Sequence, residues 1–149
     1  MAGPRAPGAS RARSDGAGYA IDRSFPVIAL PVLLCFCTCP DAGVASRIAD
    51  SLVGEGLAAC VNVMPGLRSV YRWQGAVERS DEVLLLVKTT RERLPALSAR
   101  VVALHPYELP EVVAVEVAGG LSAYLDWVVE QTGQPGEPPS GVPPHRDPA

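Results

Sequence analysis

Histidine is scarce in this chain of 149 residues, which contains only His105 and His145, and lysine occurs once, as Lys88. His145 lies in a proline-rich end, so acid–base catalysis by histidine would have only His105 to use. The chain has no Gly-x-Ser-x-Gly motif, no Walker-type phosphate loop and no Gly-x-Gly-x-x-Gly motif. These absences leave no recognisable nucleophile or phosphate site, and they predict that the protein is not an enzyme.

An excess of positive charge is also missing. The net charge is −3 and the sequence pI is about 5.3, so we expect neither nucleic acid nor an anionic membrane as a partner. The apolar run that begins near Phe25 is interrupted by Pro31 and is shorter than the roughly 20 residues of a membrane span. No small-x-small cleavage site follows it, so the prediction is a cytoplasmic protein.

The two ends of the chain lack the apolar periodicity of folded elements. Residues 1–29 are rich in Arg, Gly and Ala, and residues 133–149 contain six prolines. Neither end can bury enough apolar surface to offset the entropy of ordering it, so we expect both to be disordered tails. Residues 30–132 are then the single folded domain.

Within that domain, apolar runs alternate with segments of helical spacing. Strands are expected at 32–39, 58–64, 82–90 and 111–117, and helices at 41–56, 91–104 and 121–132. Pro65 and Gly66 are expected to end the second strand, and residues 67–74 to form an extra strand turned by Gly75. Two strand–helix–strand units of this size predict an α+β ferredoxin-like sandwich. A doubly wound sheet is the alternative, although it would need more strands for its helices.

The segment 67–82 is too long for a simple turn and is expected to project as a hairpin. Tyr71 and Trp73 lie two residues apart, so they would share one face of that hairpin. An isolated hairpin is marginal in water, and a neighbouring subunit is the simplest cover for two aromatic side chains. The sequence therefore predicts an oligomer.

The stretch "ALHPYELPEVVAVEV", residues 103–117, holds the candidate metal ligands His105 and Glu111. Pro106 biases His105 away from the helical region, so the preceding helix should end at or just before His105. Imidazole nitrogen and carboxylate oxygen suit Zn²⁺ or Cu²⁺, provided that the two prolines bend the chain and a third ligand joins. The alternative is that His105 is a hydrogen-bonding residue at an edge or interface. Tyr107 and Glu108 are expected to be loop or interface contacts.

The cysteines Cys35, Cys37 and Cys39 form a C-x-C-x-C run on the first expected strand. Alternate residues of a strand lie about 6.6–7 Å apart, more than two thiolates that share one metal. We therefore interpret these residues as buried free thiols, and Cys60 as a core residue.

Five motifs resemble those of the CutA divalent-cation tolerance family, in the same order and over residues 32–130. They are "CTCPD" (37–41), "LVGEGLAACVNVMPGLRSVYRWQGAVE" (52–78), "EVLLLVKTT" (82–90), "HPYELPEVVAV" (105–115) and "YLDWV" (124–128). The resemblance implies a ferredoxin-like homotrimer, similar in architecture to PII-type signalling proteins. It also implies a role linked to copper and other divalent cations, with no obligatory cofactor.

The same resemblance implies Cys37, His105 and Glu111 as metal ligands. This chain has Leu104 where some members of the family have a second histidine. Two alternatives to a metal-binding tolerance protein remain open. One is a trimer that senses a small ligand or acts as a scaffold through inter-subunit clefts, and the other is a metal-assisted hydrolase.

Overall fold

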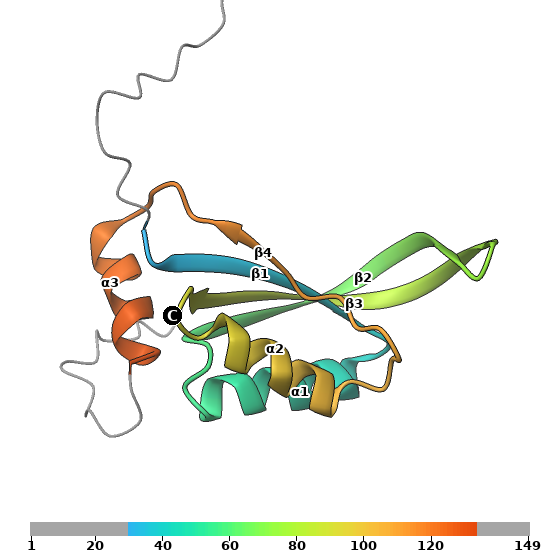
Figure 1. Cartoon of the computed structure of the whole chain (residues 1–149), viewed down its shortest axis with the longest axis horizontal. Helices are drawn as coiled ribbons and strands as arrows, with labels where there is room; N and C mark the ends of the chain where they lie inside the picture. Colours follow the sequence, from blue (N-terminus) through green and yellow to red (C-terminus); the bar gives the residue numbers. More distant parts are fainter. Residues whose placement is uncertain (1–29, 134–149) are drawn as a thin grey trace, which may run out of the picture.

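The computed structural model describes residues 30–133, which form a four-stranded sheet and three helices (Figure 1). The elements, in chain order, are β1 (Val32–Cys39), α1 (Ala42–Gly54), β2 (Cys60–Trp73), β3 (Ala76–Thr90), α2 (Leu94–Leu104), β4 (Val113–Glu116) and α3 (Ser122–Gln131). The predicted tails, 1–29 and 133–149, lie outside the described residues except for Gly133. Within 30–133, no helix is both long and apolar enough to cross a membrane.

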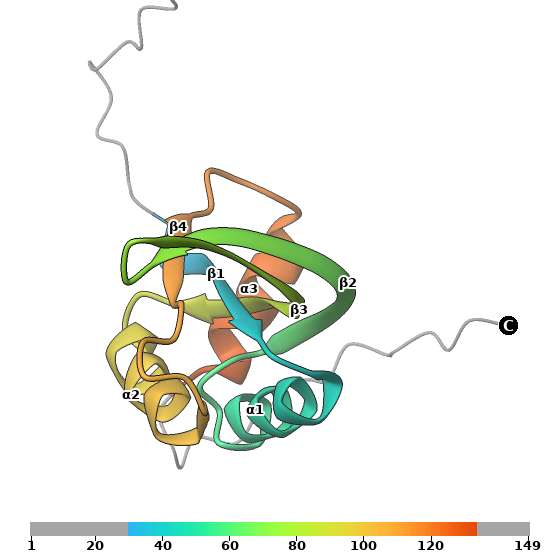
Figure 2. The same ribbon diagram turned by 90° about the vertical axis from the view of Figure 1, so that its right-hand side faces the viewer.

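The sheet is antiparallel throughout, in the order β2-β3-β1-β4. β1 is central: it pairs with β3 along its whole length and with β4 from Leu33 to Phe36. Helices α1 and α2 cover one face of this sheet, whereas α3 lies at the end where β1 begins (Figures 1 and 2). The predicted α+β class is confirmed.

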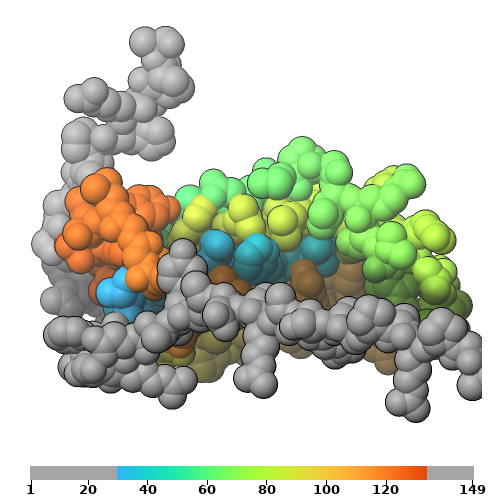
Figure 3. All heavy atoms as spheres, turned by 90° about the horizontal axis from the view of Figure 1, so that it is seen from above, coloured from blue at the N-terminus to red at the C-terminus, as the bar shows by residue number. Residues whose placement is uncertain are grey.

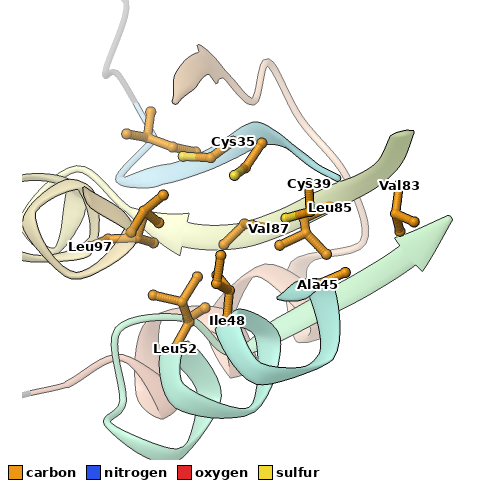
Figure 4. Packing of buried hydrophobic residues seen from close by; sticks show 13 residues of the cluster. Cys35, Cys39, Ala45, Ile48, Leu52, Val83, Leu85, Val87 and Leu97 are labelled. Carbon is orange, nitrogen blue, oxygen red and sulfur yellow. The ribbon is translucent and has the colours of Figure 1, made fainter. Parts of the chain in front are cut away.

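The hydrophobic core lies between the sheet and the two covering helices (Figure 4). The odd-numbered residues of β1 from Leu33 to Cys39 face it, because side chains alternate along a strand. α1 adds Ile48 and Leu52 at helical spacing, and Asp41 caps its first turn by accepting a hydrogen bond from the Val44 amide at 2.9 Å. The helical period of 3.6 and the strand period of 2 thus direct their apolar residues to one common layer.

The opposite face of the sheet is also apolar, but it is only partly covered. Residues paired directly across antiparallel strands point to the same side, so the even-numbered residues of β1 and β3 share this face. Leu34, Phe36, Leu84 and Leu86 are half-buried on it. Figure 3, viewed from above relative to Figure 1, shows atoms of β1, β2 and β3 at the surface.

The β2–β3 hairpin differs from the sequence prediction. Pro65 and Gly66 do not end the second strand, and no separate strand exists at 67–74, because β2 runs continuously to Trp73. A register shift between Met64 and Leu67 absorbs both residues; such a bulge tolerates proline, which has no amide hydrogen to donate. Gln74 and Gly75 close the hairpin with positive φ values of 48° and 81°, as tight hairpin turns require.

The end of α2 was predicted correctly. The helix stops at Leu104, and His105 is extended with φ −82° and ψ 136° because Pro106 follows it. Two other elements are shorter than predicted: α2 begins at Leu94 after a turn at 91–93, and β4 is limited to Val113–Glu116. β3 is longer than predicted, because it begins at Ala76 and not at residue 82. The loop between α2 and β4 therefore spans 105–112 and carries His105 and Glu111, whereas Cys37, the third predicted ligand, lies on β1.

Candidate metal centre

Three potential ligands meet where β1 ends beside the end of α2. One ligand atom each from Cys37, Cys39 and His105 lies within 4.8 Å of the other two. All three residues are buried, with exposed fractions of 2%, 0% and 7%. Within residues 30–133, no other three cysteine, histidine or acidic residues bring their ligand atoms together in this way. We refer to these residues as the Cys–Cys–His group.

The meeting of Cys37 and Cys39 corrects the expectation from strand geometry. That expectation used the spacing of alternate residues, but the two sulfur atoms come within 4.8 Å of each other. Rotation about χ1 can lean two side chains of one face toward each other, so the spacing of Sγ atoms is not fixed by that of Cα atoms. Two thiolates bound at about 2.3 Å to one tetrahedral ion lie roughly 3.8 Å apart, so sulfur atoms within 4.8 Å can share an ion after a shift of at most about 1 Å.

The two thiols are not equivalent. A hydrogen bond between them raises the pKa of Cys37, and burial and nearby charges, including those of Glu111 and Glu82, raise it further. The same hydrogen bond lowers the pKa of Cys39. Cys39 is therefore the thiol that loses its proton first, and a thiolate is the form that binds metal.

The remaining cysteines have other surroundings. Burial raises the pKa of Cys35 to about 11, and its thiol belongs to the apolar core. All four cysteines are free, as predicted. Cys60 is only half-buried, lies on the opposite face of the sheet and contacts the Lys88 ammonium at 3.9 Å, so its assignment to the core was wrong.

His105 uses both ring nitrogens in hydrogen bonds. The backbone amide of Tyr107 donates to Nδ1 at 3.1 Å, so Nδ1 carries a lone pair and no hydrogen. Nε2 therefore carries the hydrogen and donates to the carbonyl oxygen of Thr38 at 2.7 Å. These bonds agree with the alternative of a hydrogen-bonding histidine, and they fix the ring beside the thiols.

Glu111 lies outside the Cys–Cys–His group and is exposed. Its negative charge nevertheless raises the pKa of Cys37. The structure thus places Cys39, and not Glu111, beside Cys37 and His105, and the position of Cys39 in the C-x-C-x-C run was the available signal. Leu104 is half-buried and packs against the core.

Glu82 and Tyr107 form a contact that sequence reasoning missed. The Tyr107 hydroxyl donates to Oε2 of Glu82 at 2.9 Å, so one residue links His105 to a buried carboxylate. Burial and the Glu82 contact raise the pKa of Tyr107 to about 12. Glu82 follows a run of polar residues on an exposed strand, and no motif distinguished it from them.

Two thiols and one imidazole form a donor set for borderline or soft ions. Zn²⁺ commonly binds two cysteines with histidine, and copper also accepts thiolate and imidazole. The donor types, their mutual distances and their burial all fit such an ion.

Comparisons with known proteins give consistent similarities. Residues 33–131 match the family model described as "CutA1 divalent ion tolerance protein". The "Divalent-cation tolerance protein CutA" of Thermus thermophilus is 57% identical over 96 residues, covering 64% of this chain and 93% of that protein. "Protein CutA, chloroplastic" of Arabidopsis thaliana is 41% identical over 103 residues, covering 69% of this chain and 57% of that protein.

The fold is similar to a solved structure from the first of these organisms. The divalent cation tolerance protein Cut A1 of Thermus thermophilus superposes with a TM-score of 0.68 at 54% identity. The superposition covers 68% of this chain and 99% of that structure.

Proposed function

The chain belongs to the CutA1 divalent ion tolerance protein family, as its motifs predicted, and we propose that it binds copper or another divalent ion through the Cys–Cys–His group. The observation that carries this proposal is the convergence of three buried donor atoms within 4.8 Å. In this proposal Cys39 is the third ligand, and Glu111 acts as a nearby negative charge.

The hydrogen bonds of His105 favour Nδ1 as the ligating nitrogen. If Nε2 bound the ion, the ring hydrogen would move to Nδ1, where it would face the amide hydrogen of Tyr107. If Nδ1 binds the ion, Nε2 keeps its bond to the Thr38 carbonyl, which orients the ring as partners of metal-bound histidines commonly do. Binding through Nδ1 therefore costs one hydrogen bond, that of the Tyr107 amide.

Zinc titration by calorimetry tests this proposal without side reactions, because Cu²⁺ can oxidise thiols whereas Zn²⁺ is redox-inert. Cys37→Ser and Cys39→Ser should each weaken Zn²⁺ binding by about tenfold or more. Cys35→Ser is the matched control, since it alters a buried thiol of the same strand outside the group, and it should bind as the wild type does. An equal loss in Cys35→Ser and Cys39→Ser would count against a specific site.

We also propose that the chain is a homotrimer, as its family resemblance implies. The support is the apolar face opposite α1 and α2, where Val113 and Val115 of β4 are 50% and 43% exposed beside half-buried leucines of β1 and β3. A monomer would leave this face in water, which is unfavourable for a patch of that kind. Light scattering that shows a monomer at micromolar concentration would contradict the proposal.

Two predictions from the sequence accompany this function as proposals. A cytoplasmic location is tested by cell fractionation; one relative is named as chloroplastic, so the family is not confined to the cytoplasm. The absence of enzymatic activity is tested by incubating the zinc-loaded protein with activated esters and phosphate esters. Turnover that is lost in Cys39→Ser would favour the metal-assisted hydrolase instead.

A further inference from the structure

A pocket of about 720 Å³ lies between the β2–β3 hairpin and the loop that joins α2 to β4. Figure 1 shows this loop passing beside the base of the projecting hairpin. The volume is in the range of small-molecule sites. Neither the two thiols of the metal centre nor His105 lines the pocket, so it is a separate feature.

The pocket contains a buried carboxylate with no cationic partner among the described residues. Glu82 is 7% exposed and lines the pocket; its Oε2 accepts the Tyr107 hydroxyl, and no described residue donates to its Oε1. The adjacent Asp81 is exposed and yet pairs with Arg68 at 3.2 Å. Burying a carboxylate is costly unless a cation or several donors compensate for the lost water. No buried side-chain oxygen of the described residues lacks a hydrogen bond, so Oε1 of Glu82 keeps contact with solvent, and a positively charged group would be favourable beside it.

The other charges of the lining add to this preference. Glu108 and Glu111 contribute two more carboxylates and Arg72 one guanidinium, so three negative charges and one positive charge give a formal net charge of −2. No ion pair joins Arg72 to Glu82 within residues 30–133. The pocket is therefore an acidic site whose innermost carboxylate is not neutralised by the described part of the protein.

Aromatic side chains form much of the rest of the lining. Tyr71, Trp73 and Tyr107 all contribute to it, and each is more than a third exposed in the single chain. In the proposed trimer, a neighbouring subunit would border the pocket on the side of Tyr71 and Trp73. Tyr71 is held in place by a hydrogen bond between its hydroxyl and that of Ser80 at 3.0 Å. The faces of aromatic rings attract cations, and they favour weakly hydrated organic cations over hydrated metal ions.

We propose that this pocket binds a small organic cation, with an ammonium group paired to Glu82 and alkyl carbons against Tyr71, Trp73 and Tyr107. A hydrated divalent metal ion fits less well, because it would require several oxygen ligands and Glu82 is the only buried carboxylate in the described lining. This inference goes beyond metal binding at the Cys–Cys–His group and does not depend on it.

Calorimetric titration of the full-length protein with putrescine tests the inference. Putrescine carries two ammonium groups on a short alkyl chain, and 1,4-butanediol is its neutral counterpart. We expect saturable binding of putrescine, no binding of butanediol, and a loss of about tenfold or more in Glu82→Gln, which removes the charge and keeps the shape. Asp81→Asn is the matched control: it removes the neighbouring exposed carboxylate and should leave putrescine affinity within about twofold.

Two further variants separate this site from the metal centre and from folding defects. Trp73→Leu, on the exposed hairpin, should weaken putrescine binding while leaving the circular dichroism spectrum unchanged. Cys39→Ser should bind putrescine as the wild type does while losing Zn²⁺ affinity. The inference is overturned if putrescine shows no saturation up to about 10 mM, if butanediol binds equally well, or if Glu82→Gln has wild-type affinity.

Discussion

The helix-covered part of the sheet and the projecting hairpin belong to the same two strands but have different surroundings. From Val83 to Thr89, β3 alternates between buried residues on the side of α1 and α2 and half-buried residues on the opposite face. From Ala76 to Asp81, the same strand is almost entirely exposed, and Glu82 marks the boundary. The covered part provides the apolar contacts that determine the fold, whereas both proposed binding sites lie near the boundary. The predictions below test this division, from the largest expected effect to the smallest.

Truncating a core side chain in the covered part should have the largest effect on stability. Leu85 is fully buried, so Leu85→Ala should lower the free energy of unfolding by about 2–5 kcal/mol through lost burial and the resulting cavity. Val70 on the hairpin is 60% exposed, and Val70→Ala should change the free energy of unfolding by less than about 0.5 kcal/mol. Both values come from denaturant unfolding at one protein concentration, because association adds to apparent stability. Equal losses would show that the hairpin is as well packed as the core.

The hairpin turn should respond to backbone strain and not to packing. A Cβ added at Gly75 meets no atom within 4 Å, but φ is +81°, a conformation that favours glycine. Gly75→Ala should therefore cost about 1–2 kcal/mol in the same unfolding experiment. Gly54→Ala is the control, since it also meets open space and has no positive φ. A similar cost at both positions would contradict the strain explanation.

The Tyr107–Glu82 contact at the boundary predicts a dependence on alkaline pH. The pKa of Tyr107 is raised from 10.0 to about 12, so between these values the native state keeps a proton that the unfolded state has lost. The free energy of unfolding should fall as pH rises from 10 to about 12, and this contribution is fully present below pH 10. Tyr107→Phe has no such proton, so its difference from the wild type should be constant below about pH 10 and shrink above it. A difference that stays constant up to about pH 12 would show that Tyr107 titrates normally.

The ion pair on the hairpin should have the smallest effect. Arg68 and Asp81 lie 3.2 Å apart, but their side chains are 68% and 82% exposed, so water and salt screen the interaction. Arg68→Ala should change the free energy of unfolding by at most about 0.5 kcal/mol at moderate salt. A larger loss that disappears in high salt would show that this pair stabilises the hairpin.

The sequence predicted the covered part better than the boundary. Apolar periodicity placed β1 correctly, and Pro106 located the end of α2, because both signals are local. Pro65 led to a wrong end for β2, because a bulge in the pairing with β3 accommodates this proline, and the sequence of β2 alone does not show that bulge. The Cys37–Cys39 contact depends on side-chain rotation. The burial of Glu82 depends on Tyr107, which lies on a loop more than twenty residues away in the sequence. These features arise from tertiary contacts that residue spacing does not encode.

X-ray absorption at the zinc edge of the zinc-loaded protein tests the central claim most directly. Coordination by Cys37, Cys39 and His105 predicts two sulfur ligands at about 2.3 Å and at least one nitrogen ligand at about 2.0–2.1 Å. The Cys39→Ser protein should show one sulfur fewer. A first shell of oxygen and nitrogen alone in the wild-type protein would contradict the proposed metal centre.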